Sequence, residues 1–396
     1  MVMQSGNQSA TQSAAVYEIP AVEPAEEAAL ERIDDLRRQL RFHVAEEPRR
    51  WVGSVRRVLS ARAIQGSNSI EGYEVSVEDA LAAVDGDEPA EAEERNWLAV
   101  LGYRRAMTYV LQLANDPYFE YSPALLRSLH FMITEYTLEA SPGLWRPGPI
   151  WVRNGATGEI VYEGPEAEAV PQLVDALISQ LRGNEGVPAM IRAAMAHLNL
   201  AMIHPFRDGN GRMARCLQTL ALARDRVLSP EWMSIEEHLG AHSQDYYKIL
   251  ATVGQGAWSP ARDARPWVHF CLRAHYVQAA RVLRRIRESE RLWAALDGLR
   301  AKHDLPERVV GTLFDAATGL RIRNSSHRRS VASAEGVEIS AQAATNDLGA
   351  MARAGLLVRR GEKRGTYYEA TERLFEMHAR ASEAGPPLDA DSLFDT

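Results

Sequence analysis

The chain has 396 residues, 46% of them hydrophobic, so it can bury a sizeable core and has room for two or three domains. Its formal net charge of −8 argues against a protein that coats nucleic acid over its whole surface. The chain contains no apolar run of about 18 residues and no signal-peptide pattern at its amino terminus. These features predict a cytoplasmic protein without a membrane partner.

The amino-terminal region is expected to be helical after a flexible tail. Residues 1–22 are rich in Gln, Ser, Ala and Glu, a composition that rarely orders. Within residues 23–95, apolar side chains recur at helical spacing over 28–44, 52–65 and 77–84, and Ser76 is a suitable cap for the last helix. Between the second and third helices lies the stretch Gly66-Ser67-Asn68-Ser69-Ile70-Glu71-Gly72.

The next region continues as helices and then changes period. Residues 96–113 and 124–134 have helical spacing. Residues 149–153 and 159–162 are short β-prone runs around a glycine-containing loop, which predicts a hairpin. A hairpin alone is only marginally stable, so it should pack against the helices.

Two histidines and two cysteines receive a structural interpretation. His130 and His197 fall on apolar helix faces without a metal ligand at suitable spacing, so we expect hydrogen-bonded core histidines. The only cysteines, Cys216 and Cys271, are far apart and are expected to be small buried hydrophobic side chains in a reducing compartment.

A dense polar stretch follows the predicted helix over 187–203. It reads His204-Pro-Phe-Arg-Asp-Gly-Asn-Gly-Arg-Met-Ala-Arg215. Pro205 places His204 at a helix end, and the next helix is expected over 213–223. Gly209, Asn210 and Gly211 therefore lie where its first backbone N–H groups are unpaired, which is an arrangement that binds phosphates.

Each polar side chain of this stretch suits a role in phosphate chemistry. His204, with an ordinary pKa of about 6.5, can accept a proton from a hydroxyl. Asp208 offers one hard oxygen to Mg²⁺. Arg212 and Arg215 share a helix face and can hold further phosphate oxygens. Phe206 is expected to anchor the loop in the core.

Residues 204–215 resemble the signature of the Fic family, His-Pro-Phe-x-Asp/Glu-Gly-Asn-Gly-Arg-x-x-Arg, and match every fixed position. The resemblance implies a mainly α fold, with a Fic-type helical core and a β-hairpin flap. It also implies ATP as substrate with Mg²⁺ as cofactor, and transfer of AMP to a Ser, Thr or Tyr hydroxyl of a target protein. Kinase-like relatives carry lysine in place of the second glycine of the turn. Gly211 is retained here, which favours AMP transfer.

Two earlier segments also resemble parts of this family. Ser67, Glu71 and Gly72 match its inhibitory motif, Ser/Thr-x-x-x-Glu-Gly/Asn, which implies that Glu71 pairs with Arg215 and keeps it from the γ-phosphate. The alternative is an exposed glutamate before a helix-ending glycine, without effect on activity. The hairpin stands where the family has its flap, so Ile150, Trp151, Val152 and Arg153 are expected to align the target segment.

The helices after the motif resemble the end of the Fic core. They are expected over 216–226, 243–250 and 267–272, and the core with its carboxy-terminal helices is assigned to residues 96–300. Tyr246 and Tyr247 could stack on the nucleotide base, although aromatics at such spacing more often belong to a core. We assign Tyr247 to the nucleotide site.

A long charged helix over 274–299 is expected to lead to a separate module. Residues 301–378 read as helix 309–317, helix 340–348 and strands 356–360 and 366–369, and resemble a small α/β winged-helix domain. Its basic side chains suit phosphate contact with DNA, but the recognition helix is poor in Arg and Lys, so a protein-contacting or packing role is equally supported. These side chains are Arg353, Arg359, Arg360, Lys363 and Arg364. Residues 379–396 are expected to be loose.

Three functions remain open at this stage. The first is an autoinhibited AMP transferase; the second is a DNA-binding regulator whose Fic core senses nucleotide; the third is an enzyme that removes AMP, with Glu71 orienting a water. The intact His204 and Asp208 argue against a pure sensor, which needs neither a base nor a metal ligand. A homodimer is compatible with the sequence without being required by it.

Overall fold

The computed structural model describes residues 15–45, 51–89, 91–153, 155, 157–183, 186–224, 230–362, 365–382 and 390–394. The helices are α1 Pro24–Ala45, α2 Trp51–Ser69, α3 Val77–Asp85, α4 Glu94–Leu113, α5 Pro123–Thr134, α6 Val170–Gly183, α7 Ala189–Ile203, α8 Asn210–Arg224, α9 Pro230–Met233, α10 Glu236–Ala241, α11 Ser243–Gly254, α12 Arg265–Lys302, α13 Val310–Ala317, α14 Asn324–Glu335, α15 Ala341–Arg353 and α16 Glu372–Ala381. The strands are β1 Trp151–Arg153, β2 Ile160–Glu163, β3 Gly256–Ala257, β4 Leu357–Arg360 and β5 Tyr367–Ala370. Short 3-10 helices are η1 Leu138–Ala140, η2 Ala167–Ala169, η3 Glu307–Val309 and η5 Asp391–Phe394. Across these described ranges, no helix has the length and apolarity that crossing a membrane requires.

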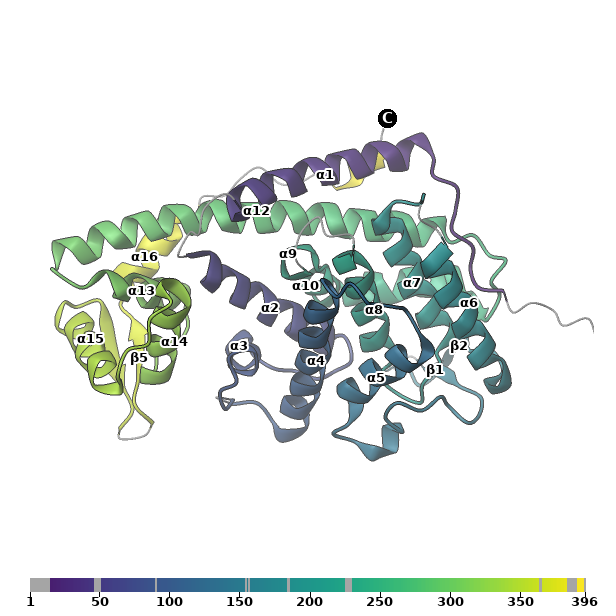
Figure 1. Cartoon of the computed structure of the whole chain (residues 1–396), viewed down its shortest axis with the longest axis horizontal. Helices are drawn as coiled ribbons and strands as arrows, with labels where there is room; N and C mark the ends of the chain where they lie inside the picture. Colours follow the sequence, from purple (N-terminus) through teal and green to yellow (C-terminus); the bar gives the residue numbers. More distant parts are fainter. Residues whose placement is uncertain are drawn as a thin grey trace, which may run out of the picture.

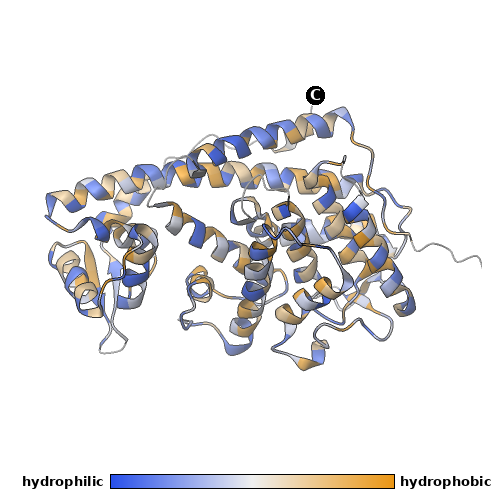
Figure 2. Ribbon diagram, in the orientation of Figure 1, coloured by the Kyte–Doolittle hydropathy of each residue, from blue (hydrophilic) through white to orange (hydrophobic). Residues whose placement is uncertain are grey.

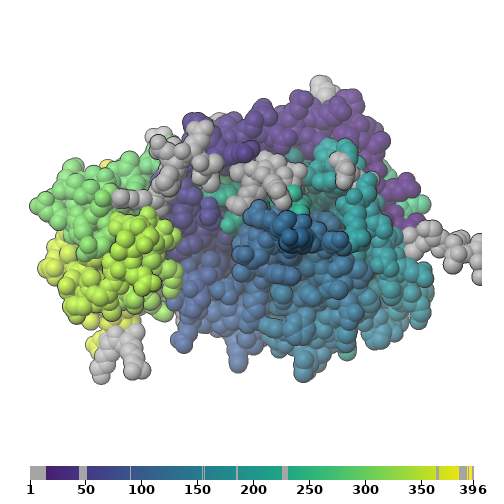
Figure 3. Space-filling model, viewed as in Figure 1, coloured from purple at the N-terminus to yellow at the C-terminus, as the bar shows by residue number. Residues whose placement is uncertain are grey.

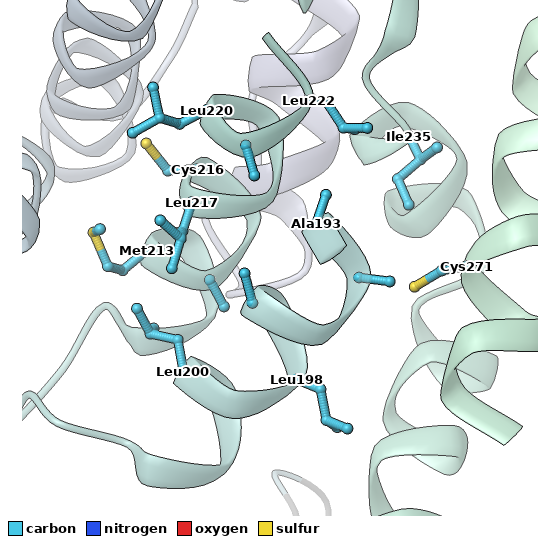
Figure 4. Close-up of a cluster of buried hydrophobic side chains, with 14 of the residues drawn as sticks. Ala193, Leu198, Leu200, Met213, Cys216, Leu217, Leu220, Leu222, Ile235 and Cys271 are labelled. Atoms are coloured by element: carbon cyan, nitrogen blue, oxygen red, sulfur yellow. The ribbon is translucent and has the colours of Figure 1, made fainter. Parts of the chain in front are cut away.

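The antiparallel pair α7–α8 forms the centre of the main core. Nearly every residue of α7 is buried, because α6, α8 and α12 pack around it. Figure 4 shows Leu198 and Leu200 of α7 together with Met213 and Leu217 of α8 inside this cluster. Hydrophobic residues (orange in Figure 2) lie among the helices around α7 and α8 and also in the carboxy-terminal module. The loop joining the two helices is therefore held at one end of a tightly packed pair.

Helix α12 runs from the main core to the carboxy-terminal module (residues 303–382), as Figure 1 shows. The sequence predicted two helices, over 267–272 and 274–299, but the structure has one helix of 38 residues. The residue between the two expected helices, Arg273, is a good helix former and no Gly or Pro interrupts this stretch, so nothing breaks the helix there. The front of α12 packs in the main core, and its later turns pack in a second core shared with α13 and α16.

The expected hairpin is present and gains a third strand. β1 and β2 pair antiparallel, and β3 pairs parallel with the other side of β2, so the strand order is β1-β2-β3. The buried Tyr162 of β2 donates a hydrogen bond to the carbonyl of Met202 at 2.8 Å, which anchors the hairpin to α7. Strand β1 lies at the edge of this sheet. A strand as short as β3 has no sequence pattern that could reveal it.

The carboxy-terminal module contains the two expected helices and the expected β4–β5 hairpin, with further helices that the sequence analysis missed. Helix α14 was missed because residues 324–335 are rich in Ser and Arg; it forms because His327, Ser330 and Val331 are buried. Helix α16 extends into the segment expected to be loose, and α6 was also not predicted. The basic residues Lys363 and Arg364 lie outside the described residues.

Parts of both expected tails are packed rather than loose. The backbone N–H of Tyr17 donates to Asn199 Oδ1 at 2.8 Å, and its fully buried ring stands edge-on to Trp258 with centroids 5.5 Å apart. Near the other end, Leu393 is buried and Phe394 stacks on His269 at 4.1 Å. The composition of a whole segment cannot reveal that a single aromatic residue in it packs against the core. Residues 1–14, 383–389, 395 and 396 lie outside the described residues.

We expect Tyr17→Ala to lower the free energy of unfolding by about 3 kcal/mol, because it removes a fully buried ring. Urea denaturation followed by tryptophan fluorescence measures the change. The matched control is Tyr118→Ala, whose ring is 90% exposed and whose loss should have little effect. Equal midpoints for the two variants would show that the amino-terminal segment is loose in solution, as the composition indicated.

Candidate active site

The proposed base His204 caps the end of α7 in a left-handed conformation (φ 51°, ψ 57°). Its Nδ1 lies 3.1 Å from the carbonyl oxygen of Ala201, so Nδ1 carries the proton and Nε2 has the lone pair that can accept one. Burial disfavours the charged form and lowers the pKa of the imidazole, against a smaller opposing effect of the Ala201 hydrogen bond. His204 is therefore neutral and basic at Nε2 near pH 7.

The loop after His204 is held by two side chains from elsewhere in the fold. His130 of α5 stacks on the buried ring of Phe206 at 3.7 Å, accepts from the N–H of Gly143 at 2.9 Å, and donates through Nε2 to the carbonyl of Asp208 at 2.9 Å. Burial lowers the pKa of His130 to about 4, so this support stays neutral. His197 is likewise a buried core histidine, bonded to Gln218 and Tyr246.

Arg146 is a site residue that the sequence analysis missed. It is 4% exposed, and its Nε donates to the carbonyl of His204 at 2.9 Å. Its Nη1 donates to Gly148 O at 2.6 Å, and its Nη2 donates to Pro165 O. One guanidinium thus joins the His204 turn to both ends of the hairpin. In the sequence, Arg146 is visible only as an arginine next to Trp145 just before the hairpin. No local sequence pattern indicates that it donates hydrogen bonds to backbone carbonyls.

The glycine-rich turn starts α8 as expected. Gly209 has φ 76°, and its N–H donates to Asp208 Oδ1 at 2.6 Å. Asp208 itself is exposed at the head of the helix. Both polar atoms of the Asn210 side chain bond the backbone of Phe206, at 2.9 and 2.8 Å, so this amide closes the loop. The first N–H groups of α8 therefore lie at the helix start next to Asp208, beside the carboxylate of Glu71.

Arg212 is almost fully buried between two tyrosines. Its guanidinium carbon lies 4.7 Å from the ring centroid of Tyr73, and its Nη1 donates to the hydroxyl of Tyr136 at 3.2 Å. Neither tyrosine was singled out in the sequence. The contacts hold Arg212 by a cation–π interaction rather than by a carboxylate, so its full charge remains available to an anion.

Arg215 is buried and is held by the end of α2. Its Nε donates to Ser67 Oγ, and its Nη2 donates to both Ser67 O and Glu71 Oε1, each at 2.8 Å. Burial alone would lower the pKa of this guanidinium, but Glu71 raises it above its ordinary value. The pair expected from the sequence is thus present. A Cβ at Gly211 would overlap Glu71 Oε1, so only glycine fits there while Glu71 points inward.

The end of α2 is secured by Gly72 and Tyr247. Gly72 has φ 80°, a conformation that favours glycine, and it turns the chain away just after Glu71. The hydroxyl of Tyr247, whose ring is 48% exposed, donates to the carbonyl of Ile70 at 2.8 Å. In this structure Tyr247 therefore contacts the segment that resembles the inhibitory motif, while its neighbour Tyr246 is a core residue.

A single carboxylate at this position suits Mg²⁺, which takes most of its other ligands from phosphates and water. Asp208 is exposed at the head of α8 and meets that requirement. Within the described ranges, no group of three or more His, Cys, Asp or Glu side chains forms a metal cage.

Comparison with known proteins assigns the central region. Residues 120–222 match the model of the Fic/DOC family, so the chain carries a Fic domain. A protein adenylyltransferase Fic from Nematostella vectensis is 26% identical over 271 residues, 64% of this chain and 56% of that protein. A probable protein adenylyltransferase from Aquifex aeolicus is 23% identical over 155 residues, 38% of this chain and 46% of that one. The chain thus spans about half the length of these curated relatives.

Solved structures show the same fold. A Fic family protein from Desulfovibrio desulfuricans has a TM-score of 0.56 at 20% identity, covering 90% of this chain and 99% of that one. Fic-1 from Caenorhabditis elegans has a TM-score of 0.51 at 20% identity, covering 65% of this chain and 72% of that one. The mainly helical Fic-type architecture expected from the sequence is confirmed.

We expect the imidazole of His204 to titrate below its ordinary value, since burial disfavours its charged form. Nitrogen-15 NMR of the histidine rings measures the midpoint and should also show protonation at Nδ1. Glu71→Gly should lower the midpoint further, because it removes a nearby negative charge. Loss of one signal in His204→Asn provides the assignment. A midpoint above about 6.5 would contradict a neutral base.

Proposed function

We propose that this chain is an autoinhibited protein adenylyltransferase that moves AMP from ATP to a Ser, Thr or Tyr hydroxyl of a target protein. The observation that carries the proposal is the stretch from His204 to Arg215, which is a loop followed by the start of α8. It brings a neutral base, a helix start that attracts anions and two arginines around one space, and one of those arginines is already bound by Glu71.

In the proposed reaction the target hydroxyl oxygen attacks the α-phosphorus of ATP. A bond forms between that oxygen and phosphorus, the bond to the oxygen bridging the α- and β-phosphates breaks, and pyrophosphate leaves. The hydroxyl proton passes to Nε2 of His204. The N–H groups at the start of α8 and the side chains of Arg212 and Arg215 hold the phosphates, so alignment and charge neutralisation do most of the work. Mg²⁺ held by Asp208 and phosphate oxygens would neutralise further charge.

The edge strand β1 supports binding of the target as an extended segment. Because β3 occupies the far side of β2, residues 150–153 present the remaining edge of this sheet among the described strands. An added strand forms backbone hydrogen bonds that do not depend on its sequence, which suits an enzyme that must hold a hydroxyl near His204. The exposed ring of Trp151 (44%) and the side chain of Arg153 flank that edge.

The structure supports autoinhibition through competition for Arg215. The carboxylate of Glu71 lies 2.8 Å from Arg215. In the proposed reaction a γ-phosphate oxygen takes this position, and two anions cannot share it. The same geometry is compatible with removal of AMP, with Glu71 orienting a water. A nucleotide sensor without catalysis remains disfavoured by the intact His204 and Asp208.

We expect transfer of label from α-phosphate-labelled ATP to protein to rise at least about tenfold in Glu71→Gly, because Arg215 then becomes free for the phosphate. Adding His204→Ala should reduce the rate by about 10²–10⁴-fold, the usual contribution of a general base. The assay uses Mg²⁺, with and without cell lysate, and label release from the products tests removal of AMP. Equal labelling by Glu71→Gly and by the double variant Glu71→Gly with His204→Ala would refute His204 as the base.

A second activity, contact with duplex DNA, is supported by the outer face of α15. This face is formed by residues that recur at helical spacing: Gln342, Thr345, Asn346, Gly349 and Arg353. The four residues other than Gly349 are exposed, and Gly349 is partly exposed. Amides, hydroxyls and arginine are the groups that read base edges in the major groove. No large apolar side chain of α15 is exposed, whereas helices that dock on proteins need apolar anchors.

We expect the full chain to enrich a preferred sequence from a pool of random duplex DNA, with binding that weakens as salt rises. Asn346→Ala and Arg353→Ala should each lower the preference by about 1–3 kcal/mol. Arg380→Ala, which removes the same charge from an exposed side chain on α16, is the matched control. Absence of both enrichment and salt-dependent binding would refute this activity.

A further inference from the structure

Helix α2 carries the inhibitory residues at one end and contacts the carboxy-terminal module at the other. The first half, with Trp51, Val55 and Leu59, is buried in the second core, together with residues of α12 and α13. The second half, with Ala61 and Ile64, is buried in the main core. Its 19 residues make a rod about 28 Å long. One helix is therefore packed in both cores, so a movement of one core can displace it relative to the other.

A close backbone contact and an ion-pair network join α2 to the module. A Cβ on Gly53 of α2 would stand 2.8 Å from Ser333 Oγ of α14, so the two helices are in direct contact. Arg57 of α2 donates to both oxygens of Asp85, at 2.9 and 2.6 Å, and lies 3.6 Å from Asp315 of α13.

Arg329 of α14 completes the network from the module side. It lies 2.7 Å from Asp85, at the end of α3, and 2.7 Å from Asp87. We call Arg57, Asp85, Asp315 and Arg329 the junction cluster. The carboxylates of Asp85 and Asp315 are only 7% and 5% exposed, so water screens them little. In Figure 3 the module (yellow-green) packs directly against the segment that contains α2 and α3.

The end of α2 that carries Ser67 is tightly packed. Ser67 and Asn68 are fully buried, and Gly66 meets Gly240 of α10 so closely that a Cβ at 240 would stand 2.6 Å from the Cα of Gly66. Because the contact with Arg215 depends on hydrogen bonds at 2.8 Å, a small shift or tilt of α2 breaks it. The position of the other end of the helix therefore matters to the site.

We propose that Arg57, Asp315 and Arg329 are positioning residues for autoinhibition: the carboxy-terminal module clamps α2 so that Ser67 and Glu71 stay on Arg215. The effect on activity rests on the proposed AMP transfer. The claim that the module holds α2 in place does not depend on that proposed function. Any partner that binds the module better when the junction cluster is open would shift the population toward the active form.

The test changes only the module's side of the junction, with Asp315→Asn plus Arg329→Gln, so that α2 and the catalytic residues keep their sequence. We expect faster amide hydrogen exchange in residues 66–73 and an increase of about fivefold or more in label transfer from ATP, the lower end of typical coupling. In the Glu71→Gly background the same substitutions should change transfer less than about twofold, since the inhibition they relieve is already gone.

The matched control is Arg308→Gln, which removes an arginine that bonds Asp347 at 2.7 and 2.9 Å within the module. It should change neither the exchange of residues 66–73 nor transfer. Arg329→Gln alone, at a side chain that is 26% exposed, serves as the second variant if the double substitution unfolds the module.

The outcomes separate the two proposals. Unchanged exchange and unchanged transfer in the junction variants, with active Glu71→Gly, would overturn the clamp and leave the proposed function intact. Inactive Glu71→Gly would overturn the proposed function, and the exchange of residues 66–73 alone would then decide whether the module holds α2. If the junction substitutions raise transfer equally in the chain with Glu71 and in the Glu71→Gly variant, the clamp would also be overturned, because the effect would not depend on Glu71.

Discussion

A buried arginine that must be compensated organises this structure. Arg215 lies at the bottom of the site with almost no exposed surface, and a guanidinium in such a position needs hydrogen-bond acceptors and opposite charge. Ser67 and Glu71 supply both from the end of α2. A phosphate would supply them equally well. The proposed inhibition would therefore be the replacement of one anion by another beside a buried positive charge.

The rest of the site is held by groups that do not titrate near neutral pH. His130 is kept neutral by burial and supports the loop through the backbone of Asp208. Arg146 binds three backbone carbonyls and thereby connects the His204 turn with the hairpin. Since these supports keep one protonation state, His204 can change its own during a reaction without altering the scaffold.

Helices that enter two cores connect distant parts of the molecule. Both α12 and α2 begin in one cluster of buried side chains and end in the other. Packed helices transmit displacement because cores are dense and resist local deformation. The junction cluster adds partly buried charge to this packing, so the carboxy-terminal module and residues 67–72 are physically linked along α2.

The sequence by itself determined where the candidate site lies: residues 204–215 hold their polar groups within one short stretch, and local spacing with Pro205 and the glycines is enough to place them around a helix start. The pairing of Glu71 with Arg215 was also readable, because both belong to recognisable motifs. Only the tertiary structure decided which side chains support the loop, as Arg146 and His130 do through backbone carbonyls that have no sequence signature. It also decided that Tyr17 is buried and that α2 is shared between two cores, because such contacts depend on which surfaces meet, and local composition carries no record of that.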